Sequence, residues 1–469
     1  MLEPHARTLL FDVLRPPDDY SLDYAIATTF TLDLLALLTA PVAFTLFEAD
    51  DHRDLLQANS LTLLESLRRY ADRLSVFTQA GHISLPKARF PQLEFLENAV
   101  IECRVNTGLF HPKVWVLRFA GPQGAVRYRF ACLSRNLTFD RCWDTTLTLE
   151  GPLRDRRNGF AANRPLLEFL QALPAMSVHA LGSEATDRIR QFADELARVE
   201  FELPEGFTEF RFHPLGISPR RRLPFEDVGG RMLAVSPFIS EDGLKRIMAG
   251  RPGSLLVTRE DSLARVGLGV PEIARCYVMR DVVETDGAGL DEEEPPTARG
   301  LHAKCYIAES GWNAHVWTGS ANATSAGFNG NVEFLVELIG LKSRVGIDAL
   351  FDEEAGKTSF GDMLDPVSPP DHPETDDSDE RAFASAVDRV RDALIARVSL
   401  EVEEADTGFR LSLRASQPLD LPGDLQVTCW PATLGEGYAV TVQAGSRMPE
   451  FSVSLEGITA FMAFKAASP

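Results

Sequence analysis

The chain of 469 residues is long enough for roughly two to four domains, and with 45% apolar residues it can fill ordinary hydrophobic cores. Its six cysteines include no C-x-x-C pair, which disfavours zinc sites and a disulfide framework and predicts buried thiols of a reducing compartment. The net charge of −21 disfavours non-specific binding to duplex DNA, because phosphate contacts require clustered lysine and arginine.

The N-terminal region contains the most apolar window of the chain, residues 30–47. Asp33 lies inside this window and Pro41 divides it, so we predict a buried helix followed by a buried strand at 42–47, and not a membrane-spanning helix. The N-terminal residues lack the basic stretch and apolar core of a secretion signal. We therefore expect a cytoplasmic protein without a membrane span.

Residues 1–200 are predicted to form an α/β lobe with a mixed sheet. A buried strand at 26–32 leads through a small polar turn into a helix at 33–38. A helix at 61–76 and a β-rich stretch at 99–104 follow, before the first of two conspicuous tripeptides.

Two tripeptides in this lobe border strand-like apolar runs. His111-Pro112-Lys113 opens the run at 114–119, and Ser134-Arg135-Asn136 closes the run at 126–133. Because side chains alternate along a strand, His111 and Lys113 are predicted to lie on one face and to point at one ligand.

Residues 201–350 repeat this order, which predicts a second α/β lobe. The expected elements are a strand at 233–240, a helix at 243–248, a strand at 254–258 and a β-rich stretch at 276–283. His302-Ala303-Lys304 then opens a second pair of apolar runs, and Ser320-Ala321-Asn322 closes it. Two copies of the same residue types in the same strand–turn–strand setting are expected to be the two halves of one active site.

The duplicated residue types suit phosphoryl transfer. Imidazole titrates at about pH 6.5, so two histidines facing one phosphate can divide the nucleophile and general-acid roles. Two lysines and two asparagines supply charge and hydrogen-bond donors for the phosphoryl oxygens. No group of histidines or cysteines has the spacing of metal ligands, and no phosphate-loop glycine pattern occurs.

The C-terminal third differs in composition. Residues 351–397 are predicted to be an acidic linker with a helix at 381–397, and residues 398–469, with their period-two pattern, a small antiparallel β domain. A further acidic run at 291–294, a few residues before His302, is expected to act as a gate that mimics phosphates. The basic clusters at 154–157 and 220–222 are expected to be solvated loops or the lining of a basic cleft.

At these residues the chain resembles the phospholipase D superfamily, whose signature is H-x-K followed downstream by Asn, twice per active site. The resemblance covers residues 24–340. The second copy is the fuller match, with Glu309 after the lysine, Gly319 before Ser320, and an N-x-E element that ends at Glu333.

The first copy departs from the signature. Arg118 stands where the second copy has its acid, and Asp144 is the counterpart of Glu333. This form is similar to that of the tyrosyl-DNA phosphodiesterase branch and of bacterial nucleases with paired H-K-D motifs. The resemblance implies two tandem lobes around one site, and a two-step phosphoryl transfer that needs no metal and no cofactor.

The resemblance also assigns a role to each site residue. His111 is the nucleophile that forms a phosphohistidine, and His302 is the acid that protonates the leaving oxygen and the base that activates water. The phosphate clamp consists of Lys113, Lys304, Asn136 and Asn322. The serines, Ser134 and Ser320, donate to the phosphate or steady the imidazoles. Glu333, with Asp144 opposite, fixes the orientation and tautomer of the histidines.

We therefore predict a DNA nuclease that acts on single- or double-stranded DNA. A helicase, a translocase or another subunit of a bacterial antiphage defence system is the expected partner, since an acidic nuclease needs a more basic protein to bring it to DNA. Two alternatives stay open: a lipid phosphodiesterase, which requires a membrane-binding surface, and a catalytically weak scaffold that senses nucleic acid.

Overall fold

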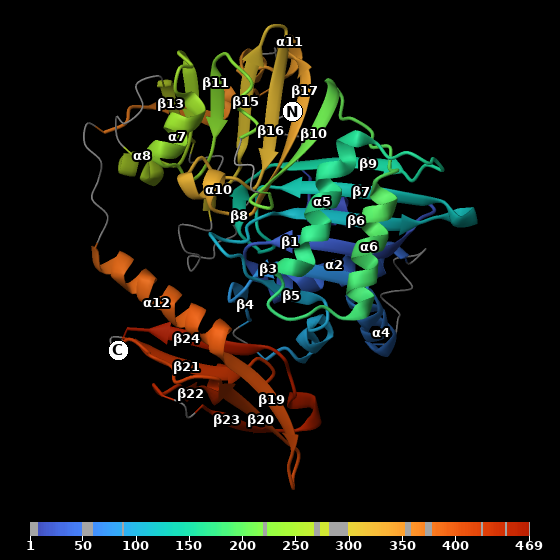
Figure 1. The fold of residues 1–469 in the computed structure, drawn as a ribbon, viewed down its shortest axis with the longest axis vertical. Helices are drawn as coiled ribbons and strands as arrows, with labels where there is room; N and C mark the ends of the chain where they lie inside the picture. Colours follow the sequence, from blue (N-terminus) through green and yellow to red (C-terminus); the bar gives the residue numbers. More distant parts are fainter. Residues whose placement is uncertain are drawn as a thin grey trace.

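The protein is built of two α/β lobes that pack against each other and of a C-terminal β unit beneath the first lobe (Figure 1). This architecture confirms the predicted fold class of two tandem lobes with mixed β-sheets flanked by helices, followed by a small antiparallel β domain. The computed structural model describes residues 8–48, 60–86, 89–218, 223–266, 273–280, 299–351, 358–370, 378–423, 425–445 and 448–468.

The first lobe contains a six-stranded mixed sheet in the order β5-β3-β1-β6-β7-β9. Its strands are β5 (Val100–Cys103), β3 (Leu74–Gln79), β1 (Ser21–Thr29), β6 (Val114–Ala120), β7 (Val126–Leu133) and β9 (Thr146–Pro152). β1 is parallel to β3 and antiparallel to β6. The carboxyl end of β1 therefore lies beside the residues that precede β6, where the first H-x-K tripeptide is found.

The second lobe repeats this order inside an eight-stranded sheet, β10-β17-β16-β15-β11-β12-β13-β18. Its strands are β10 (Phe207–Leu215), β17 (Glu333–Leu341), β16 (Asn313–Gly319), β15 (Cys305–Ser310), β11 (Met232–Val235), β12 (Ser254–Val257), β13 (Ile273–Met279) and β18 (Leu364–Val367). The strands from β17 to β13 match those from β9 to β5 in order and in relative direction. β18 extends this sheet into the segment expected to be a linker.

The strand predicted at 42–47 is wrong. These residues form the second half of helix α2 (Leu34–Glu48), and Pro41 lies inside the helix. A proline in a helix interior costs about 3 kcal/mol or more. α2 nevertheless continues because residues on both sides of Pro41, such as Leu37 and Phe44, are fully buried in the core of the first lobe. Tertiary packing thus outweighs the local signal.

The helix predicted at 61–76 is correct only in its first part. α4 (Ser60–Ala71) ends earlier, and strand β3 follows it as the second strand from one edge of the sheet. All six residues of β3 are buried, and a short buried strand has no alternation that distinguishes it from a buried helical segment. β3, and not residues 42–47, is therefore the counterpart of β12 in the second lobe.

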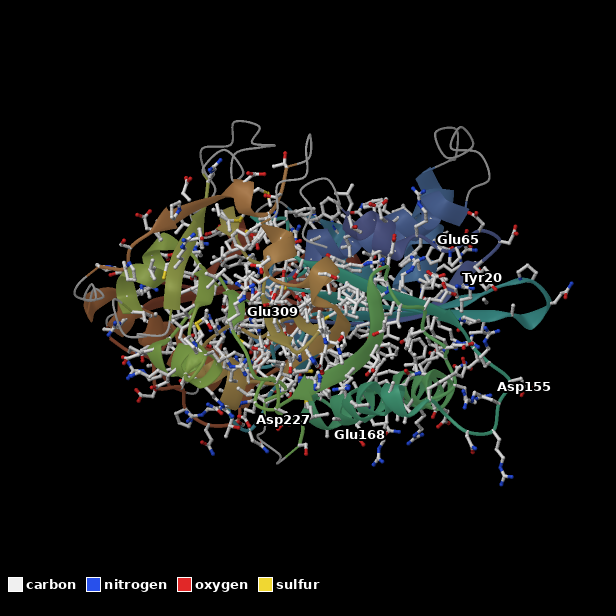
Figure 2. All side chains as sticks on the ribbon, turned by 90° about the horizontal axis from the view of Figure 1, so that it is seen from above. Tyr20, Glu65, Asp155, Glu168, Asp227 and Glu309 are labelled. Atoms are coloured by element: carbon white, nitrogen blue, oxygen red, sulfur yellow. The ribbon has the colours of Figure 1, made fainter. Side chains whose placement is uncertain are left out.

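The two lobes share one hydrophobic core. Phe130 of β7 and Phe334 of β17 come from different lobes, and their ring centroids lie 5.6 Å apart. Helices α5 (Arg164–Ala172) and α6 (Ser183–Leu196) flank the sheet of the first lobe. Figure 2 shows side chains crowded between the lobes, with exposed acids such as Asp155 at the periphery. The lobes are therefore packed together as one unit.

The C-terminal domain has its own core. Helix α12 (Ser378–Arg397) packs against two three-stranded antiparallel sheets. The strands are β19 (Val398–Glu404), β20 (Phe409–Ala415), β23 (Glu450–Val453), β22 (Val440–Thr441), β21 (Gln426–Pro431) and β24 (Met462–Ala467). This domain contacts the first lobe, where the Thr459 hydroxyl donates to the Glu97 carboxylate at 2.6 Å. No helix among the described residues has both the length and the apolarity needed to cross a membrane.

Candidate functional site

The two H-x-K tripeptides lie just before the strands β6 and β15, and not within them. Their lysine side chains nevertheless turn back onto their own histidines. Lys113 Nζ lies 3.0 Å from His111 Nε2, and Lys304 Nζ lies 3.1 Å from His302 Nδ1. Both lysines are almost completely buried, at 1% and 0% exposure. The expected pairing of each histidine with its lysine is present, although its geometry does not come from strand alternation.

Each histidine is anchored by the backbone of the opposite lobe. The His111 N–H donates to the Val332 carbonyl at 2.9 Å, and the His302 N–H donates to the Trp143 carbonyl at 2.8 Å. Val332 and Trp143 directly precede Glu333 and Asp144. These two equivalent bonds join the halves into one site, and they make Asp144 the structural counterpart of Glu333.

Glu333 is fully buried and is the centre of a hydrogen-bond network. It accepts a hydrogen bond from His111 Nδ1 at 2.8 Å, from the Ser320 hydroxyl, and from Asn331 Nδ2 at 3.1 Å. Burial by itself raises the pKa of a carboxyl group, but His111, Lys113 and the Ser320 hydroxyl outweigh it and lower the pKa of Glu333. The ionised carboxylate therefore holds the proton of His111 on Nδ1 and leaves the Nε2 lone pair available.

Asp144 does not hold His302 in the same way. Its Oδ2 atom lies 3.3 Å from Nε of Arg135 and is buried without a hydrogen-bond partner. Burial raises the pKa of Asp144, more than Arg135 and Lys304 lower it. The two halves of the site thus have equivalent backbone hydrogen bonds, but Glu333 binds a histidine whereas Asp144 lies against an arginine.

All four basic groups of the site are disfavoured as cations. Burial and then the charge of Lys113 lower the pKa of His111 to about 4, and burial lowers the pKa of Lys113 to about 7. Burial and the neighbouring lysines hold the pKa values of His302 and Lys304 well below their usual ranges. An anion bound among these groups restores their protonated forms, so the site is suited to a negatively charged ligand.

The motif serines and asparagines are placed by mirrored contacts. The Ser134 hydroxyl accepts the Thr145 N–H at 2.8 Å, and the Ser320 hydroxyl accepts the Phe334 N–H at 3.0 Å. The side-chain oxygens of Asn136 and Asn322 are both buried without a protein partner. Each asparagine thus has a polar atom that the surrounding protein does not satisfy.

Two hydroxyl residues that sequence reasoning did not assign hold the asparagine segments. The Leu137 N–H donates to Thr29 Oγ1 at 3.0 Å, and the Ala323 N–H donates to Ser236 Oγ at 2.9 Å. Leu137 and Ala323 directly follow the motif asparagines. The small polar residues at the end of β1 and after β11 are the sequence signal from which these residues could have been identified.

Phe30 covers one side of the nucleophile candidate. Its ring centroid lies 5.0 Å from that of His111, and His82 packs on Phe30 at 4.4 Å. Nη1 of Arg391, on α12, lies 3.3 Å from Nε2 of His82. The C-terminal domain is therefore connected to His111 through the rings of His82 and Phe30. Local sequence does not reveal this connection.

The acid that follows the second lysine lies outside the site. Glu309 pairs with Arg231 at 2.9 Å and accepts the Ile347 N–H at 2.9 Å. Arg118, at the equivalent position of the first lobe, pairs with Glu195 at 2.8 Å. Both residues support the outer parts of their lobes, so the departure of the first motif at Arg118 leaves the paired histidines intact.

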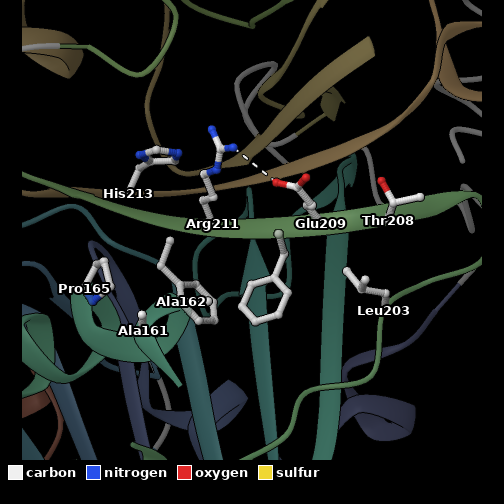
Figure 3. A pocket seen from close by; sticks show the side chains of 10 residues that line it. Ala161, Ala162, Pro165, Leu203, Thr208, Glu209, Arg211 and His213 are labelled. Atoms are coloured by element: carbon white, nitrogen blue, oxygen red, sulfur yellow. Dashed lines mark hydrogen bonds and ion pairs between the residues drawn. The ribbon is translucent and has the colours of Figure 1, made fainter. Parts of the chain in front are cut away.

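A separate open hollow of about 650 Å³ lies beside the edge strand β10. Figure 3 shows apolar residues such as Ala162 and Leu203 on one side of the strand, and Arg211 and His213 on the other. His213 and His315 both contact the buried Glu337, each at 2.7 Å. None of the residues that line this hollow belongs to the paired motifs.

Some sequence features fall outside the described residues. These are the acidic run at 291–294 and the basic cluster at 220–222. Among the residues that the structure describes, no three His, Cys, Asp or Glu side chains are grouped so that they can hold a metal ion.

Comparison with known proteins gives structural likeness only. No family model matches the chain, and no curated protein does. Two solved variants of yeast tyrosyl-DNA phosphodiesterase are 10% and 11% identical, with TM-scores of 0.38 and 0.40. The matches cover 72% and 73% of this chain and 86% and 88% of theirs. Polyphosphate kinase from Porphyromonas gingivalis is 13% identical at a TM-score of 0.36, over 82% of this chain and 51% of its own.

Proposed function

We propose that the protein is a metal-independent phosphodiesterase that works through a phosphohistidine on His111. The observation that carries this proposal is the cross-lobe pair of His111 and Glu333, with Lys113 at the other ring nitrogen of His111. This arrangement fixes the Nδ1–H tautomer and presents Nε2 as a nucleophile, with Lys113 next to it to take up a proton and hold the phosphoryl oxygens when a diester binds. A histidine with only a surface role does not require a fully buried carboxylate to orient it. The His111–Glu333 pair therefore supports a catalytic role for His111.

In the first step, Nε2 of His111 attacks the phosphorus of a diester, a P–N bond forms, and the P–O bond to the leaving group breaks. His302 gives its proton to the leaving oxygen. In the second step, His302 takes a proton from water, the water oxygen attacks phosphorus, and the P–N bond breaks. The negative charge of the bound diester favours the protonated form of His302 that the first step requires.

The clamp residues stabilise the charge that builds on the phosphoryl oxygens. Lys113 and Lys304 lie in a buried, water-poor setting, where a cation acts more strongly than in solvent. The amide groups of Asn136 and Asn322, whose oxygens have no protein partner, can turn a donor toward the phosphate.

We propose DNA as the substrate. Two isolated aromatic side chains follow the site elements closely in sequence: Phe139, which is 57% exposed, comes three residues after Asn136, and Phe238, which is 38% exposed, two residues after Ser236. Single exposed aromatics suit base stacking, whereas a lipid site needs a continuous apolar surface. The net charge of −21 supports recruitment to DNA by a more basic helicase or translocase partner, as in an antiphage system.

The test is cleavage of single- and double-stranded DNA in excess EDTA by the wild type, His111→Ala and His302→Ala. We expect EDTA-resistant cleavage that both substitutions abolish. His179→Ala, which changes an exposed histidine outside the site, serves as the matched control and keeps full activity. Cleavage that EDTA abolishes contradicts the mechanism, and choline release from lipid in place of DNA cleavage contradicts the substrate.

A further inference from the structure

Only one of the two equivalent acids holds a histidine. The backbone brings Asp144 to His302 as it brings Glu333 to His111, through the two cross-lobe hydrogen bonds. Glu333 completes its pair at 2.8 Å, whereas Oδ2 of Asp144 is buried without a hydrogen-bond partner. The histidines also differ in the nitrogen that meets the lysine, which is Nε2 in His111 and Nδ1 in His302. The side chains of the second half of the site are therefore not arranged as those of the first half are.

Arg135 is the group that engages Asp144 instead. Its Nε lies 3.3 Å from Asp144 Oδ2, and its Nη2 donates to the Thr138 carbonyl at 2.9 Å and the Asp140 carbonyl at 2.7 Å. The same side chain thus ties the acid to the segment that follows Asn136. In the second lobe the equivalent residue is Ala321, which has no side chain that can reach Glu333.

We propose that Arg135 is a positioning residue that holds Asp144 away from His302, and that Asp144 must leave Arg135 before His302 acts as the acid. This inference rests on the proposed function, because it takes the acid role of His302 from it. The release involves the segment 135–140, whose carbonyl groups Arg135 holds. Phe139 in that segment is 57% exposed.

The charges around His302 explain why an acid partner matters. The charged and titratable groups that act on His302 are Lys304, Lys113 and His111. Asp140, Arg135, Asp144 and Arg259 act on Cys142, two residues before Asp144, and Glu333 binds His111 on its far side. Burial and the two lysines hold the pKa of His302 well below its usual range. A carboxylate that moves next to His302 raises this pKa and makes the imidazolium available.

The inference is tested first on the protein without substrate, by NMR titration of ¹⁵N-labelled histidine side chains. Arg135→Gln keeps an amide donor for the carbonyls of the segment but loses the ion pair. We expect the midpoint of His302 to rise by about one pH unit or more in this variant, while that of His111 stays unchanged. Because no substrate is involved, this result stands or falls separately from the proposed reaction.

The double variant Arg135→Gln, Asp144→Asn separates release of the acid from simple loss of a positive charge. If Asp144 carries the effect, the rise in the His302 midpoint disappears in the double variant. A rise that persists there, or no rise in Arg135→Gln at an unchanged melting temperature, overturns the inference.

The leaving group provides a second readout. A diester with an alkoxide leaving group needs the acid, whereas a p-nitrophenyl ester does not. We expect Arg135→Gln to extend the alkaline limb of kcat for the alkoxide substrate only. Equal effects on both substrates overturn the inference, because they mean that Arg135 acts on binding or on the fold.

Discussion

His111 and Glu333 are 222 residues apart in sequence, and their side chains form a hydrogen bond that joins the two lobes at the candidate site. The duplicated H-x-K tripeptide identified His111, and the resemblance to the phospholipase D superfamily identified Glu333. Their contact across the lobes was implied only by the resemblance, and no local pattern contains it. The engagement of Asp144 by Arg135 was not foreseen, because an S-x-N motif does not specify where the middle side chain points.

The first prediction at the residue scale concerns Glu333→Gln. We expect the turnover of a p-nitrophenyl diester to fall by about 10–100-fold, because the tautomer of His111 is no longer fixed by a carboxylate. Steady-state kinetics measure this. Glu309→Gln, which changes an acid of the same strand-rich lobe outside the site, is the control and keeps wild-type turnover. Equal losses in both variants contradict the role of Glu333.

The second prediction concerns pH. The pKa of His111 is about 4 and that of Lys113 is about 7 in the folded protein. When the pH is above these values, each group binds fewer protons in the folded protein than in the unfolded chain. Their contribution to the free energy of unfolding therefore rises with pH, from about 4 to 6.5 for the histidine and from about 7 to 10.5 for the lysine.

An oxyanion that restores these protons stabilises the protein more at low pH. We expect vanadate to raise the melting temperature more at about pH 6 than at about pH 8.5, and calorimetry in two buffers to show proton uptake on binding. Lys113→Met reduces this difference. A larger shift at the higher pH contradicts the assigned pKa directions.

At the element scale, the last residue of β1 and the residue that follows β11 hold the asparagine segments. Thr29→Val and Ser236→Ala remove the hydroxyl oxygens that accept the Leu137 and Ala323 N–H groups. Each unsatisfied N–H costs about 1–3 kcal/mol. We expect a lower melting temperature and a raised KM. Thr186→Val, which removes an exposed hydrogen bond in the first turn of α6, is the control and changes neither.

Elements were predicted well where their pattern was distinctive. The strands that border the tripeptides and the helix α12 follow clear apolar spacing and were found. β3 and the second half of α2 were not, because a fully buried segment is apolar in every register. Distinguishing them requires knowledge of the sheet into which they pack.

On the scale of the whole molecule, one hydrophobic core joins the two lobes, and the C-terminal domain has a core of its own. We expect calorimetry to show one transition for the two lobes and a separate one for residues 378–468. Phe130→Ala lowers the free energy of unfolding of the two lobes by about 3–5 kcal/mol and leaves the second transition unchanged. Leu411→Ala lowers the free energy of unfolding of the C-terminal domain alone. A single transition that both variants shift equally contradicts this division.

The most direct test of the paired-histidine mechanism is to trap its intermediate. His302→Ala, given a p-nitrophenyl diester whose leaving group needs no acid, is expected to release about one equivalent of p-nitrophenol and then to stop. Mass spectrometry then finds the phosphoryl group on His111. Sustained turnover without an adduct, or an adduct on any other residue, contradicts the assignment of His111 as the nucleophile.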